Sequence, residues 1–71
     1  MGRLAKEFGL AVKRLRTSHG YSQEGFAHKA GISRTYMSEI ERGTTNVSLE
    51  TINRIALALG ISMSKVLAAM E

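Results

Sequence analysis

The stretch from Ser22 to Gly43 constrains the fold of this chain more than any other segment. Its apolar residues recur at helical spacing on the inward sides of two short helices: Phe26, Ala30, Ile32, Met37 and Ile40. Gly31 lies where the chain must turn with a positive φ, and the small Ala27 lies where the helices must nearly touch. The polar residues then left exposed on the second helix are Arg34, Thr35, Ser38 and Glu39. This geometry lets a protein insert one helix into the major groove of DNA.

Apolar residues at three- and four-residue spacing predict helices along the rest of the chain as well. We expect helices over about 3–18, 22–30, 33–42 and 48–59, and a short fifth helix, from about 62, that contains Met70. The expected N-caps are Ser22, Ser33, Ser48 and Ser62. Strand-like alternation is absent, so the sequence predicts an all-α fold of five helices. The helix-turn-helix occupies about 22–42, and the last two helices, about 48–70, serve the core and dimerisation.

Length and composition narrow the class of protein further. Seventy-one residues form one domain, residues 1–71, and apolar runs of at most four or five residues are too short to span a membrane. No leader sequence is evident, so we expect a cytoplasmic protein. Cysteine and aspartate are absent, and His19 and His28 have no ligand partners at metal spacing. The sequence therefore predicts no enzyme, no metal and no cofactor, and stability that depends on helix packing or self-association.

The formal net charge of +4 is distributed unevenly along the chain. Residues 1–42 contain eight Lys and Arg against four Glu, whereas residues 43–71 contain two against two. The whole positive excess therefore lies in the first three predicted helices. Such an excess attracts a polyanion and leaves the neutral part for packing or dimerisation. The alternative is that the charge only keeps a small protein soluble.

Several motifs together resemble the Xre/Cro/C1-type helix-turn-helix regulators. They are Ser22-Gln23 through Ile40-Glu41-Arg42-Gly43, then Asn46, Ser48-Leu49 and Ile55-Ala56-x-Ala58-Leu59-Gly60. The resemblance covers about residues 4–67 and implies a compact, lambda-repressor-like DNA-binding domain. Within that family, the string from Arg34 to Asn46 is most similar to the controller proteins of restriction–modification systems. Those proteins are short, lack an effector domain and act as dimers.

The first exposed side chains of the second motif helix are the candidates that read bases. Arg34 can donate two hydrogen bonds to O6 and N7 of a guanine. Thr35 offers a hydroxyl and a methyl group, and Ser38 lies one turn further along the same side. Glu39 can accept from a cytosine amino group, or instead orient Arg34 or Arg42. The alternative for the whole set is that these side chains are only solvated.

A second set of residues is expected to contact DNA phosphates or to support the fold. Gln23 begins the first motif helix, where free backbone N–H groups favour a phosphate, and Tyr36 can reach a phosphate or pack over that helix. The family resemblance implies further phosphate contacts from Arg42, Thr44, Thr45, Asn46 and Ser48. It also implies a buried ion pair between Arg16 and Glu41, which would be structural.

These residues favour a sequence-specific regulator that binds double-stranded DNA as a homodimer on a palindromic operator. One recognition helix reads too few base pairs for genomic selectivity, and a symmetric dimer doubles the site. The candidate dimer-interface residues are Leu57, Met63, Val66, Leu67 and Met70, with packing inside one chain as their alternative. Regulation would then depend on operator arrangement and contact with RNA polymerase. The alternative function is a protein-interaction module, of antitoxin or coactivator type, whose C-terminal apolar surface binds a different protein.

Overall fold

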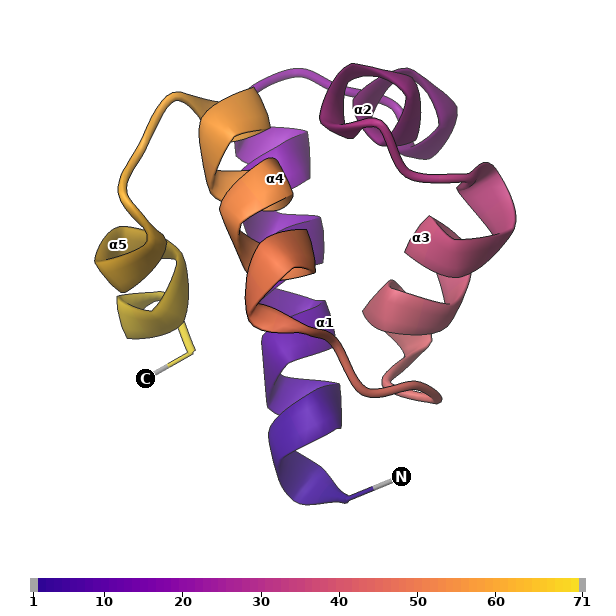
Figure 1. Cartoon of the computed structure of the whole chain (residues 1–71), viewed down its shortest axis with the longest axis vertical. Helices are drawn as coiled ribbons and strands as arrows, with labels where there is room; N and C mark the ends of the chain where they lie inside the picture. The colour runs from indigo at the N-terminus through magenta and orange to yellow at the C-terminus, as the bar shows by residue number, and fades with distance from the viewer. Residues whose placement is uncertain (1, 71) are drawn as a thin grey trace.

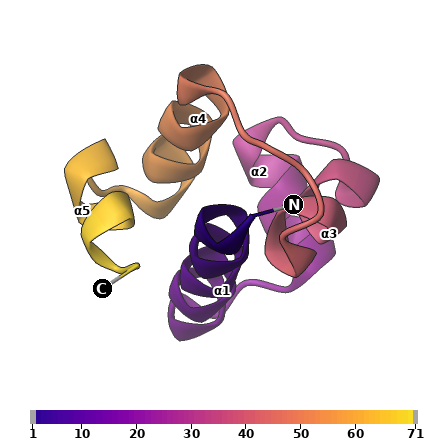
Figure 2. The ribbon, with the colours of Figure 1, turned by 90° about the horizontal axis from the view of Figure 1, so that it is seen from below.

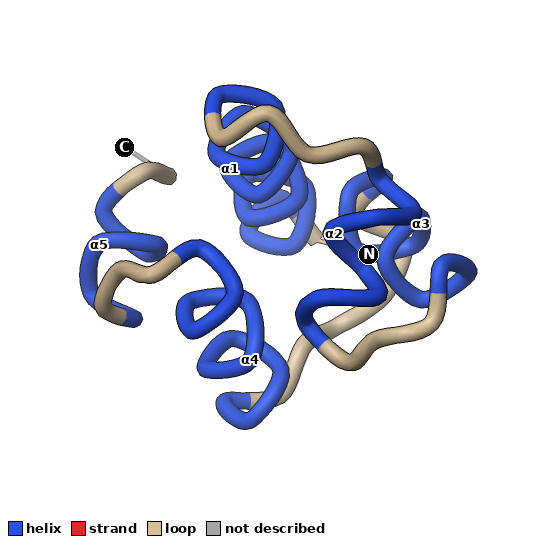
Figure 3. Tube along the Cα trace, turned by 90° about the horizontal axis from the view of Figure 1, so that it is seen from above, coloured by secondary structure: helices blue, strands red, loops and turns tan. Residues whose placement is uncertain are grey.

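Five helices make up the secondary structure of the computed structural model, which describes residues 2–70. They are α1 (Arg3–Ser18), α2 (Gln23–Ala30), α3 (Arg34–Arg42), α4 (Leu49–Leu59) and α5 (Met63–Ala68). Only loops and turns connect them within the described range (Figure 3). The predicted all-α fold is therefore confirmed. No helix in residues 2–70 is long and apolar enough to cross a membrane.

Helices α1 and α4 occupy the middle of the molecule, with α5 on one side and the α2–α3 pair on the other (Figure 1). The view from below shows the same order (Figure 2). Contacts join α1 to α3, α2 to both α3 and α4, and α5 to both α1 and α4. The principal extents are 27 × 24 × 21 Å. This arrangement leaves the outer side of α3 uncovered by any other helix.

Serine caps and left-handed glycines determine where the helices begin and end. The side-chain oxygens of Ser22, Ser33, Ser48 and Ser62 each accept a backbone N–H from the residue three positions later. These bonds satisfy donors that the first helical turn leaves without a partner. The positive-φ glycines that follow helices are Gly20, Gly31, Gly43 and Gly60. The expected boundaries agree with these positions, except at the C-terminal end.

The fifth helix is shorter than expected. It ends at Ala68, so Met70 lies in the turn beyond it rather than within the helix. No glycine marks this end, since Ala69 is the C-cap and its N–H is shared between the carbonyls of Lys65 and Val66. The Arg14 guanidinium also donates to the Ala69 carbonyl at 2.8 Å, which ties the turn to α1.

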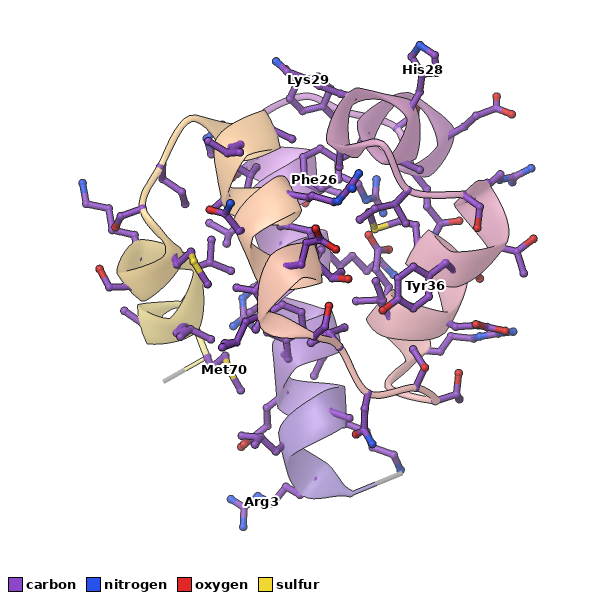
Figure 4. The ribbon with its side chains drawn as sticks, viewed as in Figure 1. Arg3, Phe26, His28, Lys29, Tyr36 and Met70 are labelled. Atoms are coloured by element: carbon purple, nitrogen blue, oxygen red, sulfur yellow. The ribbon has the colours of Figure 1, made fainter. Side chains whose placement is uncertain are left out.

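The core is formed by apolar side chains from all five helices. The largest fully buried side chains are Val12, Phe26, Met37, Ile40, Ile55 and Val66. Phe26 points from α2 toward α4 and the centre of the molecule (Figure 4). Val66 is 0% exposed, so its assignment to the dimer interface was wrong. Its side chain anchors α5 to the rest of the same chain.

Two glycines allow α1 and α3 to touch backbone to backbone. A Cβ atom on Gly9 would lie 2.3 Å from the carbonyl oxygen of Ile40 and 2.7 Å from that of Glu41. A Cβ on Gly43, whose φ is +72°, would lie 2.6 Å from the Cα of Lys6. Gly9 was not identified from the sequence as a contact residue. The sequence pattern that could have identified it is a glycine in the middle of a predicted helix, where glycine usually allows close packing.

We predict that Gly9→Ala destabilises the protein, because the new methyl group meets fixed backbone carbonyls and forces α1 away from α3. The expected loss is about 2–3 kcal/mol of unfolding free energy, as in other overpacked cores, measured by urea denaturation. Gly2→Ala is the matched control, since no atom in the described part of the chain, beyond Gly2 and its sequence neighbours, lies within 4 Å of its new Cβ. Equal stability of the two variants would contradict the close contact.

Candidate nucleic-acid interface

A polar hollow of about 260 Å³ lies on the uncovered side of α3. Its lining residues are Gln23, Arg34, Thr35, Ser38 and Arg42. The structure thus brings three of the four base-reading candidates together with two of the phosphate candidates. Gln23 comes from the start of α2, and the other four come from α3.

The hollow is electropositive, because Arg34 and Arg42 stand at opposite ends of α3 and both are exposed. Within residues 2–70, the ion pairs of the protein are Arg3–Glu7 and Arg16–Glu41, so neither of these two guanidinium groups has a carboxylate partner. Their donors remain available for an acceptor outside the chain.

Glu39 lies apart from this group of residues. It is half-buried and does not line the hollow, although the sequence placed it among the base-reading candidates. Its side chain forms no ion pair with Arg34 or Arg42 in the described part of the chain. The Glu39 backbone carbonyl instead accepts from the N–H and the hydroxyl of Thr44.

Tyr36 points from α3 toward α4 and does not cover α2 (Figure 4). Its phenol oxygen lies 3.4 Å from Oγ1 of Thr51, which in turn lies 3.1 Å from Oγ of Ser48. Two phosphate candidates, Tyr36 and Ser48, therefore meet at the buried Thr51 near the beginning of α4. Thr51 was not identified from the sequence. The sequence pattern that could have identified Thr51 is a hydroxyl residue one turn before Ile55, on the inward side of the helix.

The loop between α3 and α4 contains the remaining phosphate candidates. Asn46 is exposed, and Thr44 and Thr45 use their hydroxyl protons inside the loop, on the carbonyls of Glu39 and Asn46 respectively. A phosphate oxygen can only accept. Either hydroxyl would therefore have to rotate away from its carbonyl in order to contact DNA.

The buried ion pair that the family resemblance implied joins α1 to α3. Nε of Arg16 lies 2.7 Å from Oε2 of Glu41, and Nη2 lies 3.0 Å from Oε1. These side chains are only 9% and 5% exposed. The remaining Arg16 nitrogen donates to the carbonyl of Tyr21 at 2.9 Å. The hydrogen bond to Glu41 raises the pKa of Arg16 above its ordinary value, so the guanidinium stays charged.

The candidate dimer residues are not equally accessible. Leu57 is 71% exposed and Leu67 is 41% exposed, whereas Met63 and Met70 are half-buried against the core. Leu67 and Met70 also line a mainly apolar hollow of about 280 Å³, together with Leu4 of α1. Leu4, which is as exposed as Leu57, was not among the residues expected there.

Comparison with known proteins places this geometry in a family. A sequence model described as helix-turn-helix matches residues 12–66. The control protein C.BamHI of Bacillus amyloliquefaciens is 49% identical over 55 residues, covering 76% of this chain and 68% of the relative. The control protein C.MunI of Mycoplasma sp. is 42% identical over 65 residues, covering 90% of this chain and 88% of the relative.

A solved structure agrees with the sequence relatives. The restriction-modification controller protein C.AhdI of Aeromonas hydrophila superposes with a TM-score of 0.84 at 40% identity. The match covers 87% of this chain and 94% of that one. Fold and sequence thus lead to the same group of regulators.

We predict that Arg16→Met lowers the unfolding free energy by about 3–5 kcal/mol, because the variant leaves the Glu41 carboxylate buried without its partner. Urea denaturation measures the loss. Arg3→Ala is the control, since it breaks an exposed ion pair and should change stability by less than about 1 kcal/mol. Similar losses in the two variants would mean that the buried pair contributes no more than a surface pair.

Proposed function

The chain belongs to the Xre-type helix-turn-helix family of DNA-binding transcriptional regulators, and we propose that it acts as a homodimer on a palindromic operator. Its similarity to control proteins supports a role as the controller of a restriction–modification system. The observation that carries the proposal is the polar hollow on α3, where Arg34 and Arg42 have no carboxylate partner among residues 2–70. We place the protein in the cytoplasm, with its operator, and propose contact with RNA polymerase as one route of its regulation.

Each residue of the hollow has a distinct chemical task in this proposal. Arg34, at the first position of α3, reads a guanine through two parallel hydrogen bonds. Thr35 and Ser38 contact neighbouring bases from the same side of the helix. Arg42 and Gln23 flank them and bind phosphates, which sets the depth and register of α3 in the groove. The hollow therefore combines reading and positioning in one surface.

Dimerisation extends the DNA site that the protein recognises, because a single α3 reads too few base pairs. A twofold dimer presents two recognition helices to half-sites about one helical turn apart. We assign its interface to the exposed side chains of α4 and α5, Leu57 and Leu67, with Met63 and Met70 beside them. These four side chains are uncharged, whereas the hollow is lined by two arginines, and charged residues are depleted at the cores of protein interfaces.

The apolar hollow near Leu4 and Leu67 favours the alternative function, in which a different protein binds the C-terminal surface. Size-exclusion chromatography with light scattering separates the two hypotheses. A stable dimer of the purified chain supports the regulator, and a monomer supports the interaction module.

Selection of bound duplexes from a random pool tests the proposed function directly. We expect recovery of a palindrome whose half-sites contain guanine. The affinity for it should fall by close to one log unit per log unit of salt for each phosphate neutralised. Recovery of no preferred sequence would contradict sequence-specific binding.

We predict that Arg34→Ala weakens binding to the selected duplex by about 5- to 150-fold and relaxes the preference for guanine, because a bidentate base contact is lost. Fluorescence anisotropy with duplexes substituted at one position measures both effects. Lys29→Ala is the charge-matched control, since Lys29 lies on α2 and points away from α3 (Figure 4). An equal loss for both variants would show that only net charge matters.

We also predict that Leu57→Glu converts the dimer to a monomer, because it introduces a charge at the apolar interface. Sedimentation velocity at micromolar concentration measures the change. Leu10→Glu, on the exposed side of α1, is the control for an added surface charge and should leave the dimer intact. A dimer that survives Leu57→Glu would place the interface elsewhere.

A further inference from the structure

Glu41 does more than pair with Arg16. Its Oε1 atom accepts from Nη2 of Arg16 at 3.0 Å and also from Nε2 of Gln23 at 3.1 Å. Gln23 is the first residue of α2 and lines the polar hollow with Arg34 and Arg42. One buried carboxylate therefore connects the interior ion pair to a side chain on the proposed DNA-binding surface.

The chemistry of these groups determines which way the Gln23 amide must point. Glu41 forms an ion pair with the Arg16 guanidinium, and a carboxylate in such a pair accepts hydrogen bonds but donates none. The NH₂ group of Gln23, rather than its oxygen, must therefore face Glu41. The amide nitrogen has two hydrogens, so one binds Glu41 and the second remains for an acceptor outside the chain. A reversed amide would place its oxygen against the carboxylate, and the two acceptors would repel each other.

This orientation suits a phosphate, which only accepts hydrogen bonds. A glutamine side chain that is free in solution must give up several rotamers when it binds. A glutamine already held by Glu41 loses little further freedom. Ordering one such side chain costs about two- to tenfold in affinity when it is not arranged beforehand.

We propose that Glu41 is a positioning residue for DNA binding, whose buried carboxylate holds the Gln23 amide with an N–H presented to a phosphate. The inference rests on the proposed function and deepens it. The Arg16–Glu41 pair then has two roles. It joins α1 to α3, and it prepares one DNA contact before DNA arrives.

The first test uses the unmodified protein without DNA. Gln23 is the only glutamine in the sequence, so its side-chain amide resonances are readily assigned by NMR. We expect its two amide protons to have well-separated shifts, and the proton bound to Glu41 to exchange more slowly than those of the exposed Asn53. Exchange as fast as that of Asn53 would overturn the proposal. The result does not depend on the folding of any variant.

The second test separates positioning from stability by replacing both members of the ion pair. Arg16→Met/Glu41→Leu removes the carboxylate without leaving a charge buried, and such replacements are often neutral for stability. Affinity for the selected duplex is measured for the unmodified protein, Gln23→Ala, the paired variant and the combination of all three changes. Thermal unfolding is measured in parallel, and His28→Ala, on the far side of α2 (Figure 4), is the control for truncation.

We expect Gln23→Ala to weaken binding by about five- to tenfold in the unmodified protein but by less than about twofold in the paired variant. In the paired variant Glu41 no longer holds the Gln23 side chain, so ordering that side chain on DNA offsets most of what its phosphate contact contributes to affinity. Equal losses in the two backgrounds, or no loss in the unmodified protein, would overturn the positioning role. If the unmodified protein selects no duplex at all, the proposed function fails and the inference fails with it. If the protein binds a specific duplex but Gln23→Ala weakens binding equally in the two backgrounds, the positioning role of Glu41 is overturned and the proposed function stands.

Discussion

The buried ion pair between Arg16 and Glu41 is the interaction on which the rest of this structure depends. It joins α1 to the end of α3, and the remaining Arg16 nitrogen holds the chain at Tyr21, before α2 begins. A single guanidinium therefore links α1, α3 and the segment before α2. Removal of either partner would leave a charge on an almost fully buried side chain, and that is more costly than the loss of an ordinary contact.

The glycine contact between α1 and α3 makes this ion pair possible. Gly9 lets the backbone of α1 approach the carbonyls of Ile40 and Glu41, so that Glu41 comes within reach of Arg16. Ion pair and glycine contact lie on the inner side of α3. The outer side of α3 consequently takes no part in these helix–helix contacts, and its Arg34 and Arg42 side chains are available to DNA. In the function that we propose, this division allows one short helix to be rigid and to read DNA at the same time.

Much of the fold could be predicted because local chemistry determined the helix boundaries. Ser22, Ser33 and Ser48 lie before the helices that they cap, and Gly31 and Gly43 follow the ends of α2 and α3. The end of α5 lacked such a signal, and Met70 was misplaced for that reason. Val66 was also misassigned, because apolar residues that face a partner and those that face the core have the same spacing. Exposure after folding distinguishes them.

The candidate site likewise combines features that the sequence predicted with features that only the tertiary structure shows. Local spacing placed Arg34, Thr35 and Ser38 on one exposed side of α3, and their roles toward bases remain predictions. The meeting of Tyr36 with Thr51, and of Gln23 with Glu41, joins residues 15 and 18 positions apart. By itself the sequence determined the helices, their order and the residues that α3 can present. Only the tertiary structure decided which polar groups are already occupied, because hydrogen-bond partners distant in the chain become neighbours only when the helices pack.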